Sequence, residues 1–127
     1  NPDRRVVAGK RVVMVDDSIV RGTASRKLVR MLRNAGAREV HLRIITPPII
    51  GPCFFGIDTP TLQELIASRM SIEEMRAYIE ADSLVFLSLA EMHACIPLPA
   101  SNFCSACMTR HYPMPLPPEK QFAELSS

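Results

Sequence analysis

The chain has 127 residues, of which 47% are hydrophobic and 22% are charged, and its formal net charge is +2. These totals predict one modest globular core, and the charge is too small to indicate a nucleic-acid partner or an anionic membrane surface. The sequence contains no run of eighteen apolar residues and no hydrophobic signal region, so we expect a cytoplasmic protein without a membrane span.

The first expected elements are a strand that opens at Lys10-Arg11 and runs through Val15, and a helix that follows a short loop. Apolar residues recur on one stripe of this helix with the spacing of a helical face. They are Ala24, Leu28, Met31, Leu32 and Ala35. Gly36 is expected to end the helix as its left-handed cap.

A second strand is expected over Val40–Thr46, where Pro47-Pro48 stops it. Strand, helix and strand with short links form a βαβ unit, which predicts a parallel sheet with a right-handed crossover. Because both strands are largely apolar, burial on both faces is expected. The fold class is therefore α/β.

Four more elements are expected before the chain becomes irregular. They are a helix capped by Thr59-Pro60 and ending near Ser68, a helix from the Ser71/Glu74 capping box to about Glu80, a strand over Ser83–Ser88, and a short helix over Leu89–Ile96. Six of the eleven prolines follow position 96. We therefore divide the chain into residues 1–96 and an irregular tail, 97–127.

The stretch Val12–Ser25, VVMVDDSIVRGTAS, joins an apolar strand to a helix through an acidic pair and a small-residue loop. Arg21–Ser25 can wrap a phosphate at a helix N-terminus, although an ordinary loop with Thr23 as helix cap fits as well. Asp16 and Asp17 lie at the strand's carboxyl end, where open α/β sheets bind ligands. A response-regulator receiver also has such an acidic pair, but Val40–Thr46 lacks the phospho-acceptor aspartate it requires.

This stretch resembles the phosphoribosyl-pyrophosphate signature of type I phosphoribosyltransferases, and its DDSIVRGT form is most similar to amidophosphoribosyltransferases. The segments HLRIITPPIIGPCFFGIDTPTLQELIAS, ADSLVFLSL and CSACMTRHYP resemble the C-terminal part of the same family. The resemblance runs from about Arg5 to Pro113. It implies a partial type I phosphoribosyltransferase (Rossmann-like) parallel sheet with flanking helices and an irregular, proline-rich and cysteine-containing C-terminus.

The resemblance also implies roles for residues of the loop. Asp16 and Asp17 would bind the ribose hydroxyls of phosphoribosyl pyrophosphate and its Mg²⁺, and Arg21–Ser25 would hold the 5-phosphate. The complete set of substrate-binding residues is Asp16, Asp17, Ser18, Arg21, Gly22, Thr23, Ala24 and Ser25. No residue of this chain is assigned a catalytic role. The family reaction replaces pyrophosphate by glutamine-derived ammonia and gives phosphoribosylamine, at the start of purine biosynthesis.

The four cysteines, Cys53, Cys95, Cys104 and Cys107, allow a four-cysteine zinc site by spacing alone. The resemblance implies instead a [4Fe–4S] cluster, as in one branch of the family, bound by Cys53, Cys104 and Cys107 with a fourth ligand upstream. Cys95 is then a packing residue, unless the chain is complete and Cys95 is the fourth ligand. His93 and His111 are near enough in sequence to be rivals of Cys95 as that ligand, but both are expected on the surface.

Asn1 is not the N-terminal cysteine nucleophile of the family's glutaminase domain. The first strands of the family's phosphoribosyltransferase domain, its pyrophosphate-binding loop and its flexible catalytic loop also have no counterpart here. We therefore expect a C-terminal segment or split subunit of a homo-oligomeric enzyme, inactive and poorly stable alone. Two alternatives stay open. One is a non-catalytic, regulatory phosphoribosyl-pyrophosphate-binding module, and the other is a structural zinc module.

Overall fold

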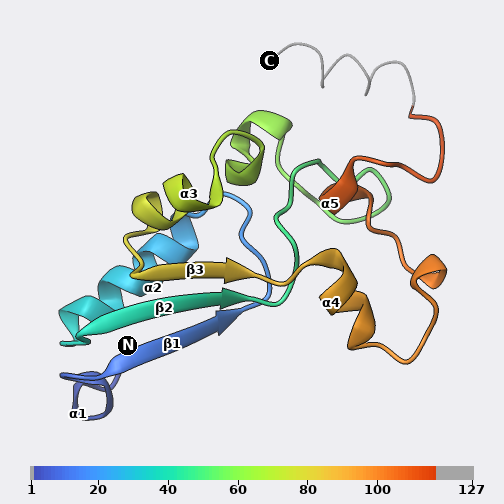
Figure 1. The fold of residues 1–127 in the computed structure, drawn as a ribbon. Coiled ribbons are helices and arrows are strands. Elements are labelled where there is room, and N and C mark those ends of the chain that lie inside the picture. Colours follow the sequence, from blue (N-terminus) through green and yellow to red (C-terminus); the bar gives the residue numbers. More distant parts are fainter. Residues whose placement is uncertain (1, 117–127) are drawn as a thin grey trace.

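The computed structural model describes residues 2–116, whose centre is a three-stranded parallel sheet in the order β1-β2-β3 (Figure 1). The strands are β1 (Arg11–Asp16), β2 (Glu39–Ile44) and β3 (Ser83–Phe86). Parallel pairing in both ladders confirms the predicted βαβ arrangement. The part of the tail from 117 to 127 lies outside the described residues.

Two helices, α2 (Thr23–Asn34) and α3 (Ile72–Ile79), lie on the same side of the sheet (Figure 1). The core between them and the sheet is built from the alternate residues of β2, which are 2% exposed or less. Its buried members are Ile19, Val29, Val40, Leu42, Ile44, Ile66, Met75, Ile79, Ala81 and Leu84. The helices bury this face along β2, whereas Val12 and Met14 of β1 are only half-buried.

The opposite face of the sheet is open, so the predicted burial of both faces is wrong for this chain. By register, Val13 lies beside His41, and Val15 lies beside Arg43, whose other neighbour is Val85. The three valines are 61%, 65% and 50% exposed in that order. No helix of the described residues covers this face.

The stripe predicted for α2 is also wrong in part. The residues that face the core are Ser25 and Val29, with Leu32 half-buried beside them, whereas Leu28 is 41% exposed. The helix is turned because its packing partners are the sheet and α3, and the Leu28 side is left without a partner. Gly36, with a φ of 97°, ends the helix as expected.

The predicted helix from Thr59 to Ser68 is wrong, because the chain forms two 3₁₀ turns, η1 (Leu62–Glu64) and η2 (Ile66–Ser68). Leu65 between them is extended, with φ −72° and ψ 109°. This break allows the Ile66 N–H to donate to the Val20 carbonyl at 2.9 Å, a bond to a distant segment that a continuous helix would forgo. Thr61, rather than Thr59, provides the cap.

The Ser71/Glu74 capping box of α3 is confirmed. The last strand ends earlier than predicted because Ser88 caps α4 (Leu89–Ala94) with a capping box of its own. Short helices α1 (Arg4–Val7), η3 (Ala100–Asn102) and α5 (Ala106–Thr109) complete the described chain. Among the described residues, none of the helices has the length and hydropathy required to cross a membrane.

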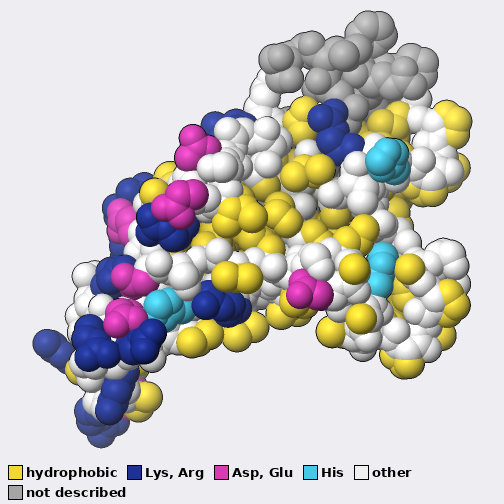
Figure 2. Space-filling view, viewed as in Figure 1, with side chains coloured by type: hydrophobic (Ala, Val, Ile, Leu, Met, Phe, Trp, Pro, Cys, Tyr) yellow, Lys and Arg dark blue, Asp and Glu magenta, His cyan; other side chains and the backbone are white. Residues whose placement is uncertain are grey.

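Charged side chains gather over α2, α3 and the amino ends of the strands, whereas hydrophobic side chains dominate the view beyond the carboxyl ends (Figure 2). Helices α4 and α5 lie beyond those carboxyl ends (Figure 1). The acidic pair, the phosphate loop and the predicted cluster cysteines lie at the same end of the sheet.

Candidate functional site

A cavity of about 340 Å³ lies at the carboxyl end of β1 and is lined by ten consecutive residues, 16–25. This set contains every residue predicted to bind the sugar phosphate. One local segment therefore forms the cavity wall, with the acidic pair at one end and the first turn of α2 at the other.

The acidic pair is shaped by local hydrogen bonds. The Asp16 carboxylate accepts the Asp17 N–H at 3.0 Å, and the Asp17 carboxylate accepts the N–H and the hydroxyl of Ser18. The hydroxyl of Thr46, two residues after the end of β2, donates to the Asp17 carbonyl at 3.0 Å. Within residues 2–116 neither carboxylate forms an ion pair. Two adjacent carboxylates without a cation are suited to bind Mg²⁺ or sugar hydroxyls.

The other end of the cavity is the N-terminus of α2. Gly22 is its N-cap, with φ 74°, and it supplies no side-chain hydrogen bond to the helix. The first intrahelical bond is donated by the Arg26 N–H to the Gly22 carbonyl, so the N–H groups of Thr23, Ala24 and Ser25 have no partner within the helix. Such N–H groups, together with the helix dipole, favour an anion. The alternative of Thr23 as the cap is wrong, because Gly22 occupies that position.

Gly22 is closely approached from behind the loop. A Cβ at this position would lie 2.9 Å from Ile66 Cδ1 and 3.3 Å from Tyr78 Cε1. The Arg26 guanidinium lies over the Tyr78 ring, 4.8 Å from its centroid. Sequence reasoning missed Ile66 and Tyr78, because both come from distant elements and neither has a residue type that signals anion binding.

The predicted cluster ligands Cys53, Cys104 and Cys107 line one cavity of about 300 Å³. Its other lining residues are mostly apolar, and the Cys107 thiol has its pKa raised, first by burial and then by the neighbouring Cys53 and Cys104. The structure therefore brings Cys53 to the Cys104/Cys107 pair, which lies about fifty residues further along the chain. Within residues 2–116, no group of three or more potential ligands is arranged to hold a single metal ion.

Cys95 is not part of this cavity. It caps α4, is exposed, and its thiol donates to the Glu91 carbonyl at 3.3 Å. The four-cysteine zinc arrangement allowed by the spacing is therefore wrong. His111 is exposed as expected, whereas His93 is half-buried and its ring stacks on that of Phe103, with centroids 6.4 Å apart.

Hydrogen bonds close the Cys53 loop on itself and join it to the segment around α5. The Thr59 hydroxyl accepts the Cys53 N–H at 2.7 Å, and the Phe55 N–H donates to the Cys53 sulfur at 3.4 Å. The Tyr112 hydroxyl donates to the Pro52 carbonyl at 2.8 Å. The Ile50 and Gly51 N–H groups also donate to the Cys107 carbonyl, both at 2.9 Å, so the start of the loop is held beside Cys107.

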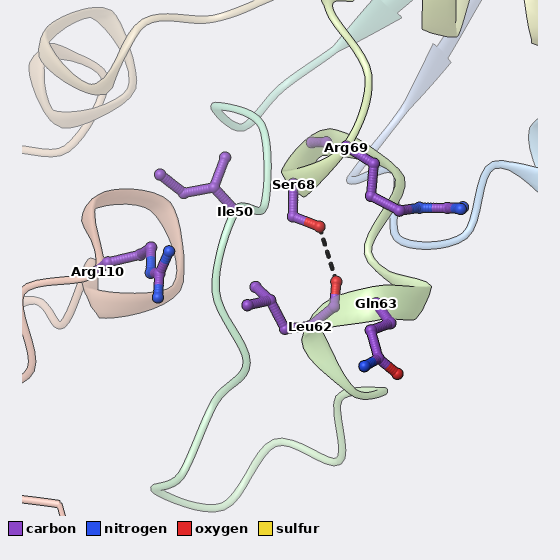
Figure 3. Close-up of a pocket in the computed structure, with 7 residues that line it drawn as sticks. Ile50, Leu62, Gln63, Ser68, Arg69 and Arg110 are labelled. Atoms are coloured by element: carbon purple, nitrogen blue, oxygen red, sulfur yellow. Dashed lines mark hydrogen bonds between the residues drawn. The ribbon is translucent and has the colours of Figure 1, made fainter. Parts of the chain in front are cut away.

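The thiol cavity and the phosphate-loop cavity share part of a wall. Ser18 and Val20 line both of them. A third cavity, of about 440 Å³, lies between residues 62–69, Ile50 and Arg110 (Figure 3). It was not predicted, and it contains none of the predicted ligand residues.

No family model matches the chain. Individual proteins do. Amidophosphoribosyltransferase 2 of Arabidopsis thaliana, a chloroplastic protein, is 55% identical over 114 residues, which cover 90% of this chain and 20% of the relative. Amidophosphoribosyltransferase of Synechocystis sp. is 54% identical over 117 residues, or 92% of this chain and 24% of the relative.

Two solved structures have the same fold over 87% of this chain. One is the allosteric regulatory enzyme of purine biosynthesis, with a TM-score of 0.79 and 55% identity, and 24% of it is covered. The other is glutamine phosphoribosylpyrophosphate amidotransferase from B. subtilis, described in complex with ADP and GMP, with a TM-score of 0.76 and 57% identity, and 25% of it is covered.

The chain spans about a fifth to a quarter of the length of these relatives. By sequence and by fold, it is a homologue of one segment of the amidophosphoribosyltransferases, and its α/β sheet is part of a phosphoribosyltransferase fold.

Proposed function

We propose that this chain supplies the ribose and 5-phosphate side of the phosphoribosyl-pyrophosphate site in a glutamine-dependent amidophosphoribosyltransferase of purine biosynthesis. The observation that carries the proposal is the cavity of residues 16–25, which is lined by two carboxylates without an ion pair among the described residues and by the N-terminus of α2. A sugar phosphate with its Mg²⁺ has the complementary groups, namely hydroxyls, a cation and a dianion.

In this proposal the two ends of the loop have different roles. Asp16 and Asp17 accept hydrogen bonds from the ribose hydroxyls and bind the Mg²⁺ that accompanies the pyrophosphate. The 5-phosphate is bound by the N–H groups of Thr23, Ala24 and Ser25, and Gly22, which has no Cβ, lets it come close to the backbone. Ser18 lines the cavity between the two ends. Mg²⁺ supplies charge neutralisation for the leaving pyrophosphate when it is bound.

The proposed reaction breaks the bond between the anomeric carbon and the pyrophosphate oxygen and forms a bond from that carbon to ammonia. The sugar passes through an oxocarbenium-like state, and the ammonium product loses one proton. Fixed carboxylates beside the sugar and backbone dipoles on the phosphate stabilise this charge separation without covalent catalysis. This chain therefore orients the substrate, and no residue of it is assigned as acid, base or nucleophile.

We further propose that Cys53, Cys104 and Cys107 are ligands of a [4Fe–4S] cluster. Three soft thiols around one largely apolar cavity form a donor set that suits iron–sulfur chemistry. The cluster would join the Cys53 loop to residues 104–107, which makes its contribution structural here. A regulator that only binds phosphoribosyl pyrophosphate has no use for these thiols, which favours the enzyme over that alternative.

The remaining parts of the proposal concern assembly. The ammonia-producing glutaminase and the rest of the phosphoribosyltransferase domain, on the same or a separate chain, complete the site in a homo-oligomer. Residues 1–96 form the phosphoribosyltransferase part and 97–127 the cluster-bearing tail. A cytoplasmic location is part of the same proposal, although the plant relatives are chloroplastic.

The test is ammonia-dependent release of pyrophosphate from phosphoribosyl pyrophosphate, measured on the protein expressed from its own gene. Removing either carboxylate by Asp16→Asn or Asp17→Asn is expected to lower kcat/KM by about a hundredfold, the effect of removing one strong transition-state interaction. Asp3→Asn is the control, since Asp3 is an exposed residue paired with Arg5 outside the site. Equal activity of all four proteins would contradict the assignment.

A further inference from the structure

The phosphate loop is held from outside by a segment that we name the strap, residues 61–68. The Ile66 N–H donates to the Val20 carbonyl at 2.9 Å, and the buried Ile66 side chain closes on Gly22. The Arg21 guanidinium donates to Glu64 Oε1 from Nε at 3.1 Å and from Nη2 at 2.9 Å. Three contacts therefore join three consecutive loop residues to the strap.

The carboxylate of Glu64 is itself fixed in place. Its second oxygen, Oε2, accepts the Thr61 N–H at 3.1 Å and the Thr61 hydroxyl at 3.0 Å. Hydrogen bonds from Arg21 and then from Thr61 lower the pKa of Glu64, so the group is ionised at neutral pH. Glu64 is thus a preformed anchor for Arg21.

The strap is closed by its own hydrogen bonds. The Ser68 hydroxyl donates to the Leu62 carbonyl at 2.7 Å, a bond drawn in Figure 3, and lies equally close to the Leu65 carbonyl. Leu65 and Ile66 are 0% and 1% exposed, which fixes the middle of the strap in the core. The loop is therefore held by a rigid support.

The Arg21–Glu64 pair itself is open to solvent, with side chains that are 54% and 45% exposed. An exposed ion pair of this kind contributes little to global stability. Arg21 directly precedes Gly22, whose φ of 74° forms the left-handed turn into α2. The pair therefore holds the chain at the residue before that turn.

We propose that Glu64 is a positioning residue for the 5-phosphate site and that it acts through Arg21. Glu64 holds the Arg21–Gly22 turn so that the N–H groups of Thr23, Ala24 and Ser25 converge on the phosphate. In this account Arg21 contributes to the site through its bond to Glu64. This inference rests on the proposed function, and it changes the sequence expectation that Arg21 holds the phosphate directly.

The two roles for Arg21 predict opposite effects of releasing it. If Glu64 positions the loop, Glu64→Gln weakens the binding of ribose 5-phosphate, by about threefold to tenfold, equivalent to a loss of up to about 1.4 kcal/mol. If Arg21 is itself the phosphate ligand and Glu64 competes for it, Glu64→Gln leaves the affinity unchanged or increases it. Titration calorimetry with ribose 5-phosphate on the protein expressed from its own gene separates these results.

A double-mutant cycle strengthens the test. Arg21→Lys keeps the charge but loses the two-pronged bond to Glu64. We expect Arg21→Lys to weaken binding as much as Glu64→Gln does, and the double variant to bind no more weakly than either one. Additive losses would overturn the proposal, because they would mean that Arg21 acts on the phosphate independently of Glu64.

A readout without ligand separates this inference from the proposed function. The N–H groups of Arg26 and Ile66 donate to the loop carbonyls of Gly22 and Val20. Amide hydrogen exchange at these two positions should be faster in Glu64→Gln and unchanged in Glu73→Gln, a control whose glutamate also binds an arginine, Arg76, but on α3. Unchanged exchange in both variants overturns the positioning role. If exchange is faster in Glu64→Gln but the wild-type protein fails to bind ribose 5-phosphate, the positioning role is supported and the proposed function is contradicted.

Discussion

Gly22 is the residue on which the geometry of the phosphate loop depends most directly. Its φ of 74° is unfavourable for any residue with a Cβ, and a Cβ would also meet Ile66 Cδ1 at 2.9 Å. Two separate constraints, one of the backbone and one of packing, therefore apply at the same atom. The chain offers a residue at which only the first constraint operates.

That residue is Gly9, with a φ of 71° and nothing within 4 Å of its Cβ position. Gly9→Ala is expected to lower the free energy of unfolding by about 1–2 kcal/mol through backbone strain. Gly22→Ala should lower the free energy of unfolding by about 1–3 kcal/mol more than Gly9→Ala does, because the added methyl group overpacks the loop against Ile66. Urea unfolding followed by circular dichroism measures both, and equal losses would mean that the Ile66 contact is not restrictive.

At the scale of elements, α2 is joined to the link between α3 and β3 by charged groups. Arg26 and Arg30 both donate to the Glu80 carboxylate, and Arg33 donates to the Glu80 carbonyl and to Asp82. Asp82 in turn accepts the Val40 N–H at the start of β2. The network therefore fixes the helix, the left-handed cap at Glu80 and the sheet relative to one another.

The network makes stability sensitive to acid. The Arg30 and Arg26 guanidinium groups lower the pKa of Glu80 from 4.5 to about 2. Because the folded pKa is below the unfolded one, the stabilisation is complete above pH 4.5 and is lost as the pH falls toward 2. Glu80→Gln should therefore destabilise the protein at pH 7 and reduce the loss of stability between pH 4.5 and 2.

Urea midpoints at pH 7 and pH 3 test this, with Glu73→Gln as the matched control. Glu73 is paired with Arg76 on the same helix and its side chain is 74% exposed, so it joins no separate elements. Its substitution should change the midpoint less than Glu80→Gln at pH 7. The reverse order would contradict a role for Glu80 in joining α2 to α3.

The elements differ in how far the sequence alone could define them. The acidic pair, the loop and the three strands were predictable, because period, strand order and a local motif determine them. The strap was not predictable, because the hydrogen bond from Ile66 to Val20 comes from 46 residues away in sequence and replaces a helix that local signals favour. The rotation of α2 also depends on a tertiary partner, α3.

The same distinction applies to the candidate site. Spacing alone did not separate Cys53, Cys104 and Cys107 from Cys95, and only the family resemblance selected these three. In the structure they line one cavity. The role of Glu64 had one local signal, the Thr61–Glu64 capping box. The bond from Arg21 to Glu64 could not be predicted, because the two residues are 43 positions apart and meet only in the folded chain.

At the scale of the whole molecule, the main feature is the open face of the sheet. Parallel sheets are covered on both faces in stable α/β domains, whereas Val13, Val15 and Val85 are exposed here. The outer edge of β1 also has no neighbouring strand within the described residues, and beside it lies an apolar cavity of about 320 Å³ that includes Leu28 and Met31. Such surfaces promote association.

We therefore expect the isolated 127-residue chain to self-associate. We also expect it to form no phosphoribosylamine, because in the proposed function the rest of the site and the ammonia source lie outside these residues. Replacing both exposed strand valines in Val13→Thr/Val15→Thr should shift sedimentation toward the monomer, because it removes apolar surface from the open face. Val6→Thr is the control, since Val6 is equally exposed but lies on α1. A wild-type chain that is monomeric at high concentration, or active alone, would contradict this expectation.

The most direct test of the central claim uses the backbone amide signals of the loop in nuclear magnetic resonance. Titration of the protein with ribose 5-phosphate in the presence of Mg²⁺ should shift the amide signals of Gly22–Ser25, and inorganic phosphate should shift the same signals less. Ribose alone should leave them unchanged. Amide signals at Gly22–Ser25 that stay fixed while signals elsewhere respond to ribose 5-phosphate would contradict the assignment of this loop as the phosphate site.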